Sequence, residues 1–298
     1  MPPVLPADLR AALEAAVGPL EAVTSIGGSF GARLLRVVAG GAAYALKWAP
    51  GGQPAAMVRA EAHGLRALAA TGAVRVPTVV VAPPDGPPPD DGGPQPAALL
   101  TEWLDGGGSR ADQAALGEAL AALHRHSAPA FGLERDNFIG GSPQPNGWIA
   151  SWPAFFRERR LLPQIALAAA AGLLPAARRR ALDRLVGRLD DLLDAPGPPA
   201  LIHGDLWAGN VVAAPGGVPA LIDPAISFSH REAELAFTEL FGGFSSRFYA
   251  AYNAAWPLDP GYADRRDLLN LYHLLNHLNL FGEGYGPQVD QTLRRYVG

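Results

Sequence analysis

The stretch His203-Gly-Asp-Leu-Trp-Ala-Gly-Asn210, followed by Leu221-Ile-Asp-Pro224, decides how the rest of the chain is interpreted. Short apolar runs accompany both segments, and Gly and Pro interrupt them. This pattern predicts buried strands joined by a tight loop and a hairpin. Such a sheet would hold the side chains of Asp205, Asn210 and Asp223 together at one edge, where they could bind a metal ion or accept a proton.

The order and spacing of these three residues match a kinase catalytic loop. An Asp is followed five residues later by an Asn, and then by an Asp on the next hairpin, as in the catalytic loop and metal-binding Asp of kinases. His-Gly-Asp alone could be an ordinary turn, and Asp-Pro alone could simply end a strand. All three elements in this order favour the kinase-like interpretation.

Composition indicates a globular protein and excludes several classes of site. Of 298 residues, 49% are apolar and 17% charged, which suits one large or two ordinary domains. A net charge of -4 gives no electrostatic case for binding nucleic acid or an anionic membrane. The chain has no cysteine, so disulfides, a disulfide-linked oligomer, thiolate catalysis and Cys-ligated zinc are excluded. Without a signal-peptide pattern or a membrane-spanning apolar run, we expect a cytoplasmic protein.

Lys47 is the only lysine among the 24 basic residues. Surface cations are otherwise Arg, so a retained Lys suggests a need for a compact ammonium, although one lysine could also occur by chance. Lys47 lies in a predicted strand, 43–48, and Glu61 lies in a predicted helix, 55–70. A Lys on a strand and a Glu on the following helix form the pair that orients a phosphate-binding lysine. The alternative for Glu61 is a solvated helix face.

A Gly-rich segment precedes this strand. Gly27 and Gly28 belong to the segment 26–33, which we expect to contain a turn before a strand. Backbone N–H groups there could lie over the phosphates of a nucleotide. Any ordinary hairpin can carry the same glycines, so the signal is weak.

A possible hinge follows the predicted strand 97–104. The next residues, Asp105-Gly-Gly-Gly108, would let the chain bend between two lobes. Strand ends between two lobes often supply backbone groups to a ligand cleft. The backbone that would bind an adenine edge is that of Glu102, Trp103 and Leu104.

We therefore predict an α+β, two-lobed, protein-kinase-like fold. Residues 1–103 would form an N-terminal lobe with a small antiparallel sheet and one main helix, and residues 104–298 a larger, mainly helical lobe. The second lobe would hold the catalytic loop, the metal site and the acceptor site. The Pro- and Gly-rich segment 83–96 cannot continue a strand and is expected to be an exposed loop. ATP and Mg²⁺ should bind between the lobes.

Trp207 stands between Asp205 and Asn210, where protein kinases commonly have a lysine. An indole offers a flat apolar face to the C–H side of a sugar or to a cationic amine, but it cannot neutralise a γ-phosphate. This favours a small acceptor such as a polyol or sugar amine over a peptide hydroxyl. Local packing of the indole is the alternative.

Together these residues make the chain resemble the fructosamine/ketosamine-3-kinase family, which belongs to the aminoglycoside-phosphotransferase-like and protein-kinase-like group. The resemblance extends over nearly the whole chain. The segments that carry it are 152–161, 201–210, 222–225, 230–236, 239–244, 248–252 and 271–282.

This resemblance implies ATP-dependent phosphorylation of the 3-hydroxyl of a ketosamine, the adduct that glycation leaves on an amine. The acceptor could be a small molecule or protein-bound, and the sugar could be ribulose, erythrulose or fructose. Phosphorylation makes the adduct prone to elimination, which frees the amine and amounts to deglycation, a form of protein repair. The implied cofactors are ATP and Mg²⁺.

The matching motifs carry the family's roles to individual positions. By this resemblance Asp205 is the catalytic base, Asn210 and Asp223 hold the metal, and Lys47 with Glu61 binds ATP.

Trp207 and His277 would contact the sugar. His277 lies with Asn276 and Asn279 in a polar cluster beside a Leu stripe. A satisfied buried network and a sugar-binding wall are both open interpretations of that cluster.

Two positions depart from the family pattern. Some members have a Cys in the Gly-rich loop that acts as a redox switch, whereas this chain has Ser29 in that region and no Cys, so no such switch is possible. The wider group often has Asp-Leu-Ala in the helix after the metal-binding Asp. This chain has Glu234-Leu-Ala, so that contact would differ in detail.

Two other functions stay open at this point. One is a kinase of the aminoglycoside or choline type, which a strongly acidic acceptor wall would favour; the chain has His, Asn and Trp instead. The other is a nucleotide-binding, pseudokinase-like module without turnover. The presence of all five expected polar residues counts against it.

Overall fold

The computed structural model describes residues 4–84, 95–194 and 197–298. It divides into two compact units: the first contains residues up to Asp112 together with 211–224, and the second contains 113–210 and 225–298. The sequence predicts a boundary after residue 103, whereas the units separate after Asp112 and the first unit includes a later hairpin. Most of the predicted loop 83–96 lies outside the described residues.

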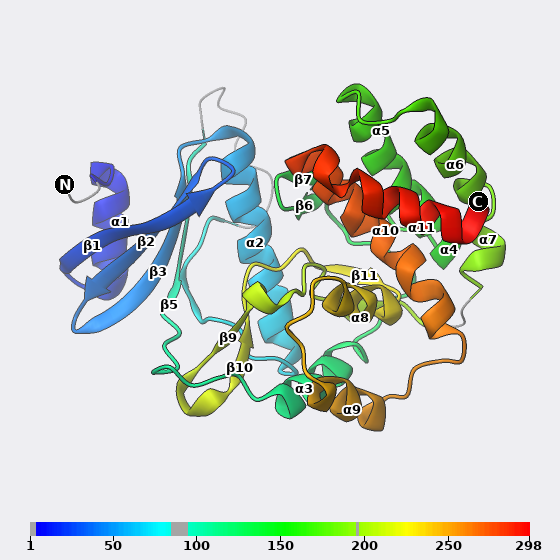
Figure 1. The fold of residues 1–298 in the computed structure, drawn as a ribbon. Coiled ribbons are helices and arrows are strands. Elements are labelled where there is room, and N and C mark those ends of the chain that lie inside the picture. Colours follow the sequence, from blue (N-terminus) through cyan, green and yellow to red (C-terminus); the bar gives the residue numbers. More distant parts are fainter. Residues whose placement is uncertain (1–3, 85–94, 195–196) are drawn as a thin grey trace. The chain divides into compact units, whose positions relative to one another are not determined.

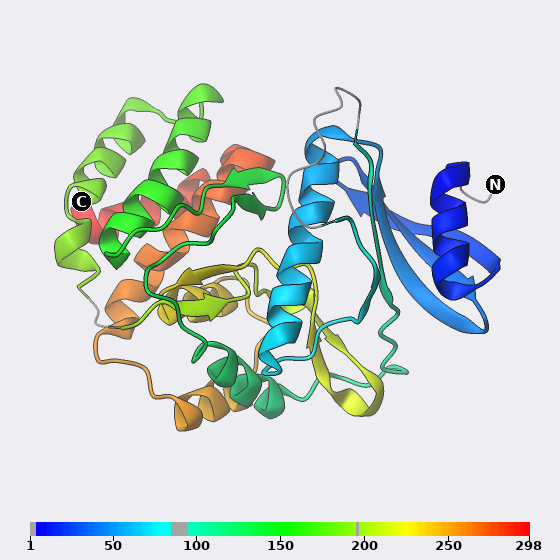
Figure 2. The same cartoon turned by 180° about the vertical axis from the view of Figure 1, so that it is seen from behind.

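The first unit is built on a five-stranded antiparallel sheet with the strand order β1-β2-β3-β5-β4. Helices α1 and α2 cover opposite faces of this sheet (Figures 1 and 2). Its elements are α1 (Ala7–Val17), β1 (Leu20–Ser29), β2 (Ala32–Ala39), β3 (Ala42–Ala49), α2 (Gly52–Thr71), β4 (Val79–Val81), β5 (Ala97–Glu102), β9 (Val211–Ala213), η3 (Pro215–Gly217) and β10 (Pro219–Leu221).

Alternation along the strands decides which side chains face each helix. Leu35 and Leu46 are paired across β2 and β3, and both are buried in a cluster with Leu13 of α1. Because successive side chains of a strand point to opposite faces, Lys47 lies on the other face of the sheet. That face is the one covered by α2, which carries Glu61.

The Gly-rich segment contains a narrower turn than expected. Gly27 and Gly28 belong to β1, which continues to Ser29. The turn consists of Phe30 and Gly31, whose φ angles are 49° and 86°. Two positive φ angles suit a two-residue hairpin whose twist matches that of the flanking strands.

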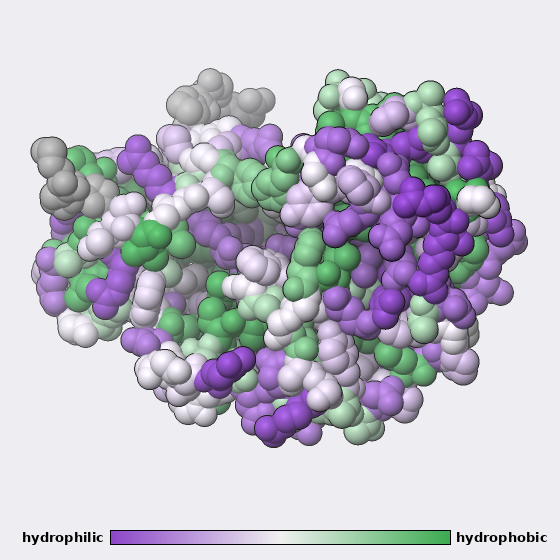
Figure 3. All heavy atoms as spheres, in the orientation of Figure 1, coloured by the Kyte–Doolittle hydropathy of each residue, from purple (hydrophilic) through white to green (hydrophobic). Residues whose placement is uncertain are grey.

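The second unit is mainly helical, with two short antiparallel strand pairs among its described residues. On the face shown in Figure 3, hydrophilic residues cover most of the region over α11. Its elements are α3 (Gln113–Leu123), β6 (Asn137–Ile139), β7 (Ser142–Gln144), α4 (Trp152–Phe155), the π-helix η1 (Phe156–Leu161), α5 (Leu162–Ala170), α6 (Ala176–Val186), α7 (Leu189–Leu192), β8 (Ala200–Ile202), η2 (Ala208–Asn210), β11 (Ser227–Ser229), α8 (Arg231–Leu240), α9 (Ser246–Ala255), α10 (Tyr262–Phe281), η4 (Glu283–Tyr285) and α11 (Gly286–Val297).

The core of this unit surrounds α10. Its buried face carries a stripe of leucines at helical spacing, which packs with the aromatic side chains of α4 and η1. No helix of the described residues is long and apolar enough to cross a membrane.

Strand pairing decides where α8 begins. Ser229 is of a residue type common at N-caps, but it pairs with Ala200 as the last residue of β11. The N-cap is His230, whose imidazole accepts a hydrogen bond from the Glu232 N–H group at 3.4 Å. Pairing of β11 with β8 therefore moves the start of the helix one residue along the chain.

Candidate active site

Lys47 lies between two carboxylates in the first unit. Its Nζ donates to Glu61 Oε2 at 2.6 Å and to Asp223 Oδ1 at 2.9 Å. Asp223 follows β10 and has a φ of 55°, a left-handed conformation that Asp tolerates better than most residues. The structure thus brings three of the predicted residues together, from β3, α2 and the end of a hairpin.

Burial and charge oppose each other in this cluster. Burial alone would lower the pKa of Lys47, but its ion pairs with Glu61 and Asp223 outweigh burial and raise that pKa above the usual range. Burial raises the pKa of Glu61, and Lys47 opposes the effect. Lys47 is therefore a fixed cation, held without the conformational freedom of an exposed lysine.

A cavity of about 290 Å³ opens beside this cluster, within the first unit. Its walls are mostly apolar, with the three charged side chains grouped among them. This combination of apolar walls and a few convergent polar groups is typical of a small-molecule site. The apolar lining includes Ile26, Leu34, Ala45, Leu65, Leu99, Val212 and Ile222.

The predicted hinge residues 102–104 also line this cavity. Hydrogen bonds within the first unit already occupy two of their three backbone N–H groups. Glu102 N–H donates to Thr78 O at 2.9 Å, and Trp103 N–H donates to Ala43 O at 3.2 Å. Among the described residues, the Leu104 N–H group makes no backbone hydrogen bond. Of the three predicted backbone donors, Leu104 N–H is thus the one left for a ligand.

The Glu102 side chain has a structural partner. Its carboxylate accepts hydrogen bonds from Arg75 and, at 2.8 Å, from the Thr78 N–H group. Burial would raise the pKa of Glu102, but these hydrogen bonds and the Arg75 charge lower it below the usual value. The Glu102 side chain thus fixes the end of β5. The backbone at this strand end remains the predicted contact with adenine.

Asp205 and Asn210 are joined within the second unit. Asn210 Nδ2 donates to the Asp205 carbonyl at 2.8 Å and to Asp205 Oδ2 at 3.1 Å. Gly204 has a φ of 84°, and a Cβ there would lie 2.1 Å from the Ala225 carbonyl oxygen, so no other residue fits. The loop therefore holds the Asp205 carboxylate in a preset orientation.

Glu234, noted from the sequence only as a departure from the Asp-Leu-Ala of the wider group, contacts the backbone directly before Asp205. Its fully buried carboxylate accepts from His203 N–H at 3.0 Å, from Gly204 N–H at 2.6 Å and from His124 Nε2 at 2.9 Å. Burial would raise the pKa of Glu234, but these donors lower it. A charged carboxylate thus fixes the peptide groups directly before Asp205. The available sequence signal was the acid at the position where the wider group often has the Asp of Asp-Leu-Ala, and that signal named no contact partner.

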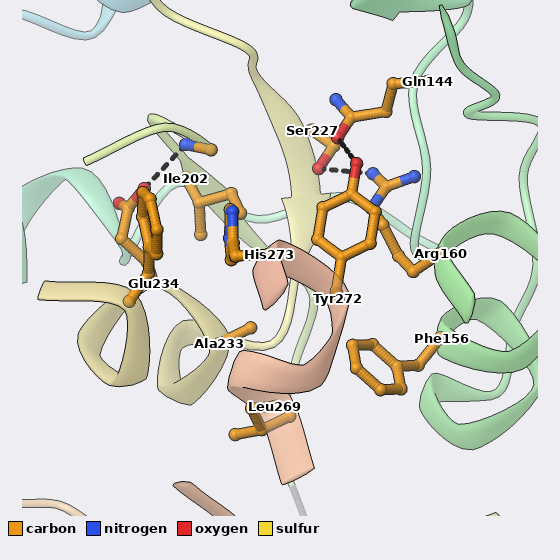
Figure 4. Close-up of a pocket in the computed structure, with 12 residues that line it drawn as sticks. Gln144, Phe156, Arg160, Ile202, Ser227, Ala233, Glu234, Leu269, Tyr272 and His273 are labelled. Carbon is orange, nitrogen blue, oxygen red and sulfur yellow. Dashed lines mark hydrogen bonds between the residues drawn. The ribbon is translucent and has the colours of Figure 1, made fainter. Parts of the chain in front are cut away.

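A second buried network supports the same loop, as Figure 4 shows. Tyr272 donates to Gln144 Oε1 at 2.6 Å, and Arg160 donates to Ser227 Oγ at 3.0 Å. Burial lowers the pKa of Arg160 to about 10. Because Ser227 pairs with Ile202 of β8, this network anchors the strand that leads into the catalytic loop.

The two predicted sugar contacts lie at the surface of the second unit. Trp207 is 45% exposed, and its indole packs over Gly209, where a Cβ would lie 2.2 Å from the ring. His277 is half-buried and donates from Nδ1 to the His273 carbonyl at 2.8 Å. Each therefore combines local packing with an accessible face.

The donor set is suited to Mg²⁺. Asn210 directly precedes β9 and Asp223 follows β10, and these strands pair through Val211 and Leu221. Amide and carboxylate oxygens are hard ligands of the type that Mg²⁺ takes beside nucleotide phosphates. The described residues contain no cluster of three or more His, Cys, Asp or Glu side chains placed to hold a metal by themselves.

Fold and site together define a protein-kinase-like phosphotransferase. An aminoglycoside phosphotransferase structure superposes with a TM-score of 0.62 at 15% identity, covering 97% of this chain and 99% of that one, which shows the shared fold. This confirms the predicted α+β, kinase-like fold class.

The chain belongs to the fructosamine kinase family, whose family model matches residues 10–298. A protein of Synechocystis sp. named a probable ketoamine kinase is 44% identical over 247 residues, covering 80% of this chain and 78% of that protein. The chloroplastic protein-ribulosamine 3-kinase of Arabidopsis thaliana is 37% identical over 244 residues, covering 81% and 72%. The crystal structure of a Thermobifida fusca protein assigned as a fructosamine-3-kinase has a TM-score of 0.84 and 35% identity, covering 96% and 97%. The predicted family, and with it the kinase class, is confirmed.

Proposed function

We propose that this chain transfers the γ-phosphoryl group of ATP to the 3-hydroxyl of a ketosamine. The observation that carries the proposal is the placement of Lys47 Nζ between Glu61 and Asp223 at a cavity lined by apolar residues and the Leu104 backbone. The names of the Synechocystis and Arabidopsis relatives support the choice of acceptor.

The first unit would bind the nucleotide. The adenine would lie between the apolar walls and accept a hydrogen bond from Leu104 N–H, and Lys47 would contact the α- and β-phosphates. The backbone of Gly27 and Gly28 would lie over the phosphates. Mg²⁺, held by Asn210 and Asp223, would neutralise phosphate charge.

The second unit would bind the acceptor. Asn210 donates to Oδ2 of the Asp205 carboxylate and so fixes its orientation, and this carboxylate would accept the proton of the 3-hydroxyl. A carboxylate is a weak base for an alcohol, so the main contribution of Asp205 would be to orient the attacking oxygen. Trp207 and His277 remain the predicted substrate contacts.

The test is ATP consumption with a panel of ribulosamines, fructosamines, aminoglycosides and choline, with free and protein-bound ketosamines compared. We expect turnover with at least one ketosamine and loss of about 10²–10⁴-fold in the rate for Asp205→Asn. Turnover with aminoglycosides or choline alone would assign the site to those acceptors. Nucleotide binding without any turnover would identify a pseudokinase-like module.

A further inference from the structure

Aromatic side chains gather around His277 on the surface of the second unit. The ring centroid of His277 lies 4.8 Å from Phe241, 5.4 Å from Phe281 and 5.0 Å from Tyr285. We call these four residues the aromatic shelf. Phe241 is 42% exposed and Phe281 60%. Clustered exposed aromatic rings are unfavourable in water unless a ligand or partner covers them.

The shelf contains one hydrogen-bond acceptor with a fixed direction. His277 Nδ1 donates to the His273 carbonyl, so Nε2 is the nitrogen that can accept. Among the described residues, Nε2 has no hydrogen-bond partner. Burial lowers the pKa of His277, which keeps the imidazole neutral near pH 7 and its Nε2 lone pair available.

The shelf adjoins the catalytic loop within the same unit. A Cβ on Gly243 would lie 2.4 Å from Ala208 Cβ, so the segment after Phe241 touches the residue next to Trp207. On α10, His273 is one turn from His277 and lines a cavity that Gly204 also lines (Figure 4). Phe241 of the shelf is thus two residues from a glycine that contacts the neighbour of Trp207.

The neighbouring acidic side chains are already paired. Glu283 accepts from Arg178 at 2.9 and 2.7 Å. Glu239 accepts from Arg266 at 3.0 Å and from the Tyr262 hydroxyl at 2.5 Å. The shelf therefore offers aromatic faces and one neutral acceptor, which suits a single soft cation with an apolar stem better than a polycation.

We propose that the aromatic shelf binds the amine side of the ketosamine, namely its secondary ammonium and an unbranched alkyl stem such as that of a lysine side chain. The ammonium donates to His277 Nε2, and the stem lies against Phe241 and Phe281. The nitrogen of a ketosamine is four bonds from its 3-hydroxyl oxygen, so an acceptor held at Asp205 directs its stem past Trp207. This inference rests on the proposed function and assigns His277 to the amine end of the acceptor.

The test compares two fructosamines that differ only in the stem, made from methylamine and from n-butylamine. The n-butylamine adduct has three more methylene groups than the methylamine adduct. Burial of one methylene contributes about 0.8 kcal/mol. Half-burial of all three should therefore make kcat/KM about 10-fold higher for the n-butylamine adduct. In Phe281→Ala most of this gain should disappear, while the rate with the methylamine adduct stays within about twofold. Leu167→Ala removes an apolar side chain that is 38% exposed on α5, outside the shelf, and should change neither rate.

The outcomes separate this inference from the function on which it rests. Equal kcat/KM for both adducts in the unaltered protein would refute the shelf and leave the kinase assignment intact. An equal loss of kcat/KM for both adducts in Phe281→Ala would also refute the shelf. The less disruptive Phe281→Leu variant, checked by thermal unfolding, shows whether misfolding causes such a loss. If neither adduct is phosphorylated while other acceptors are, the proposed function fails together with the inference.

Discussion

Replacement of Glu234 by Gln tests how the catalytic loop is held. The carboxylate accepts from two backbone N–H groups, those of His203 and Gly204, and from His124. An amide has one accepting oxygen, so whichever way Gln turns, its NH₂ group faces at least one of these backbone donors. His124 can adapt by changing tautomer, because its other nitrogen faces the Tyr252 hydroxyl at 2.8 Å. The backbone N–H group cannot adapt.

Glu234→Gln therefore leaves one buried backbone N–H group without an acceptor. This should lower the free energy of unfolding by about 1–3 kcal/mol. For a domain of this size that lowers the melting temperature by roughly 5 °C. Displacement of the peptide before Asp205 should also lower kcat by about tenfold or more. The KM for ATP should change little, because the cavity proposed to bind the nucleotide lies in the first unit.

Thermal unfolding and steady-state kinetics measure both effects. Glu239→Gln is the matched control, since Glu239 is also on α8 but its side chain is 27% exposed and pairs with Arg266. It should cost less than about 1 kcal/mol. A Glu234→Gln variant with unchanged stability and kcat would refute the claim that this carboxylate positions the loop.

Three further changes have definite expected results. Lys47→Arg should lower kcat/KM about 100-fold. A planar guanidinium cannot replace an ammonium group held 2.6 and 2.9 Å from two carboxylates. Near-normal kinetics would contradict this expectation. Trp207→Ala should raise the KM for the acceptor about 5–10-fold and leave that for ATP unchanged, and an unchanged acceptor KM would show that the indole only packs locally. Burial lowers the pKa of His273 well below 6.5, so the unfolded chain binds its proton more readily than the folded chain does. Its contribution to stability is complete above pH 6.5 and is lost as pH falls towards the lowered pKa. His273→Phe, which keeps the stacking on Phe237, should flatten denaturant-measured stability between pH 7.5 and 5; an unaltered pH dependence would be inconsistent with a buried neutral His273.

Local spacing in the sequence predicted the elements that hold Lys47 and Glu61, the proposed phosphate-binding pair. Lys47 in a strand and Glu61 in the next helix are close in sequence, and alternation within β3 alone decides which face Lys47 occupies. The loop from Asp205 to Asn210 is also local, because it closes through hydrogen bonds between residues at most five apart.

The supporting contacts could not be predicted in this way. Glu234 meets His124 across 110 residues, and Tyr272 meets Gln144 across 128. Neither pair has a characteristic spacing, because each depends on how α8 and α10 pack in the second unit. The N-cap of α8 depends on distant contacts for a similar reason: pairing of β11 with the distant β8 decides where the strand ends.

We expect this chain to phosphorylate the 3-hydroxyl of a ketosamine, with Asp205 orienting that oxygen. Phosphorus NMR of the product from ATP and a fructosamine tests it most directly. The unaltered protein should give a phosphate ester on carbon 3, and Asp205→Asn almost none. An ester at another carbon, or equal product from the Asp205→Asn variant, would contradict it.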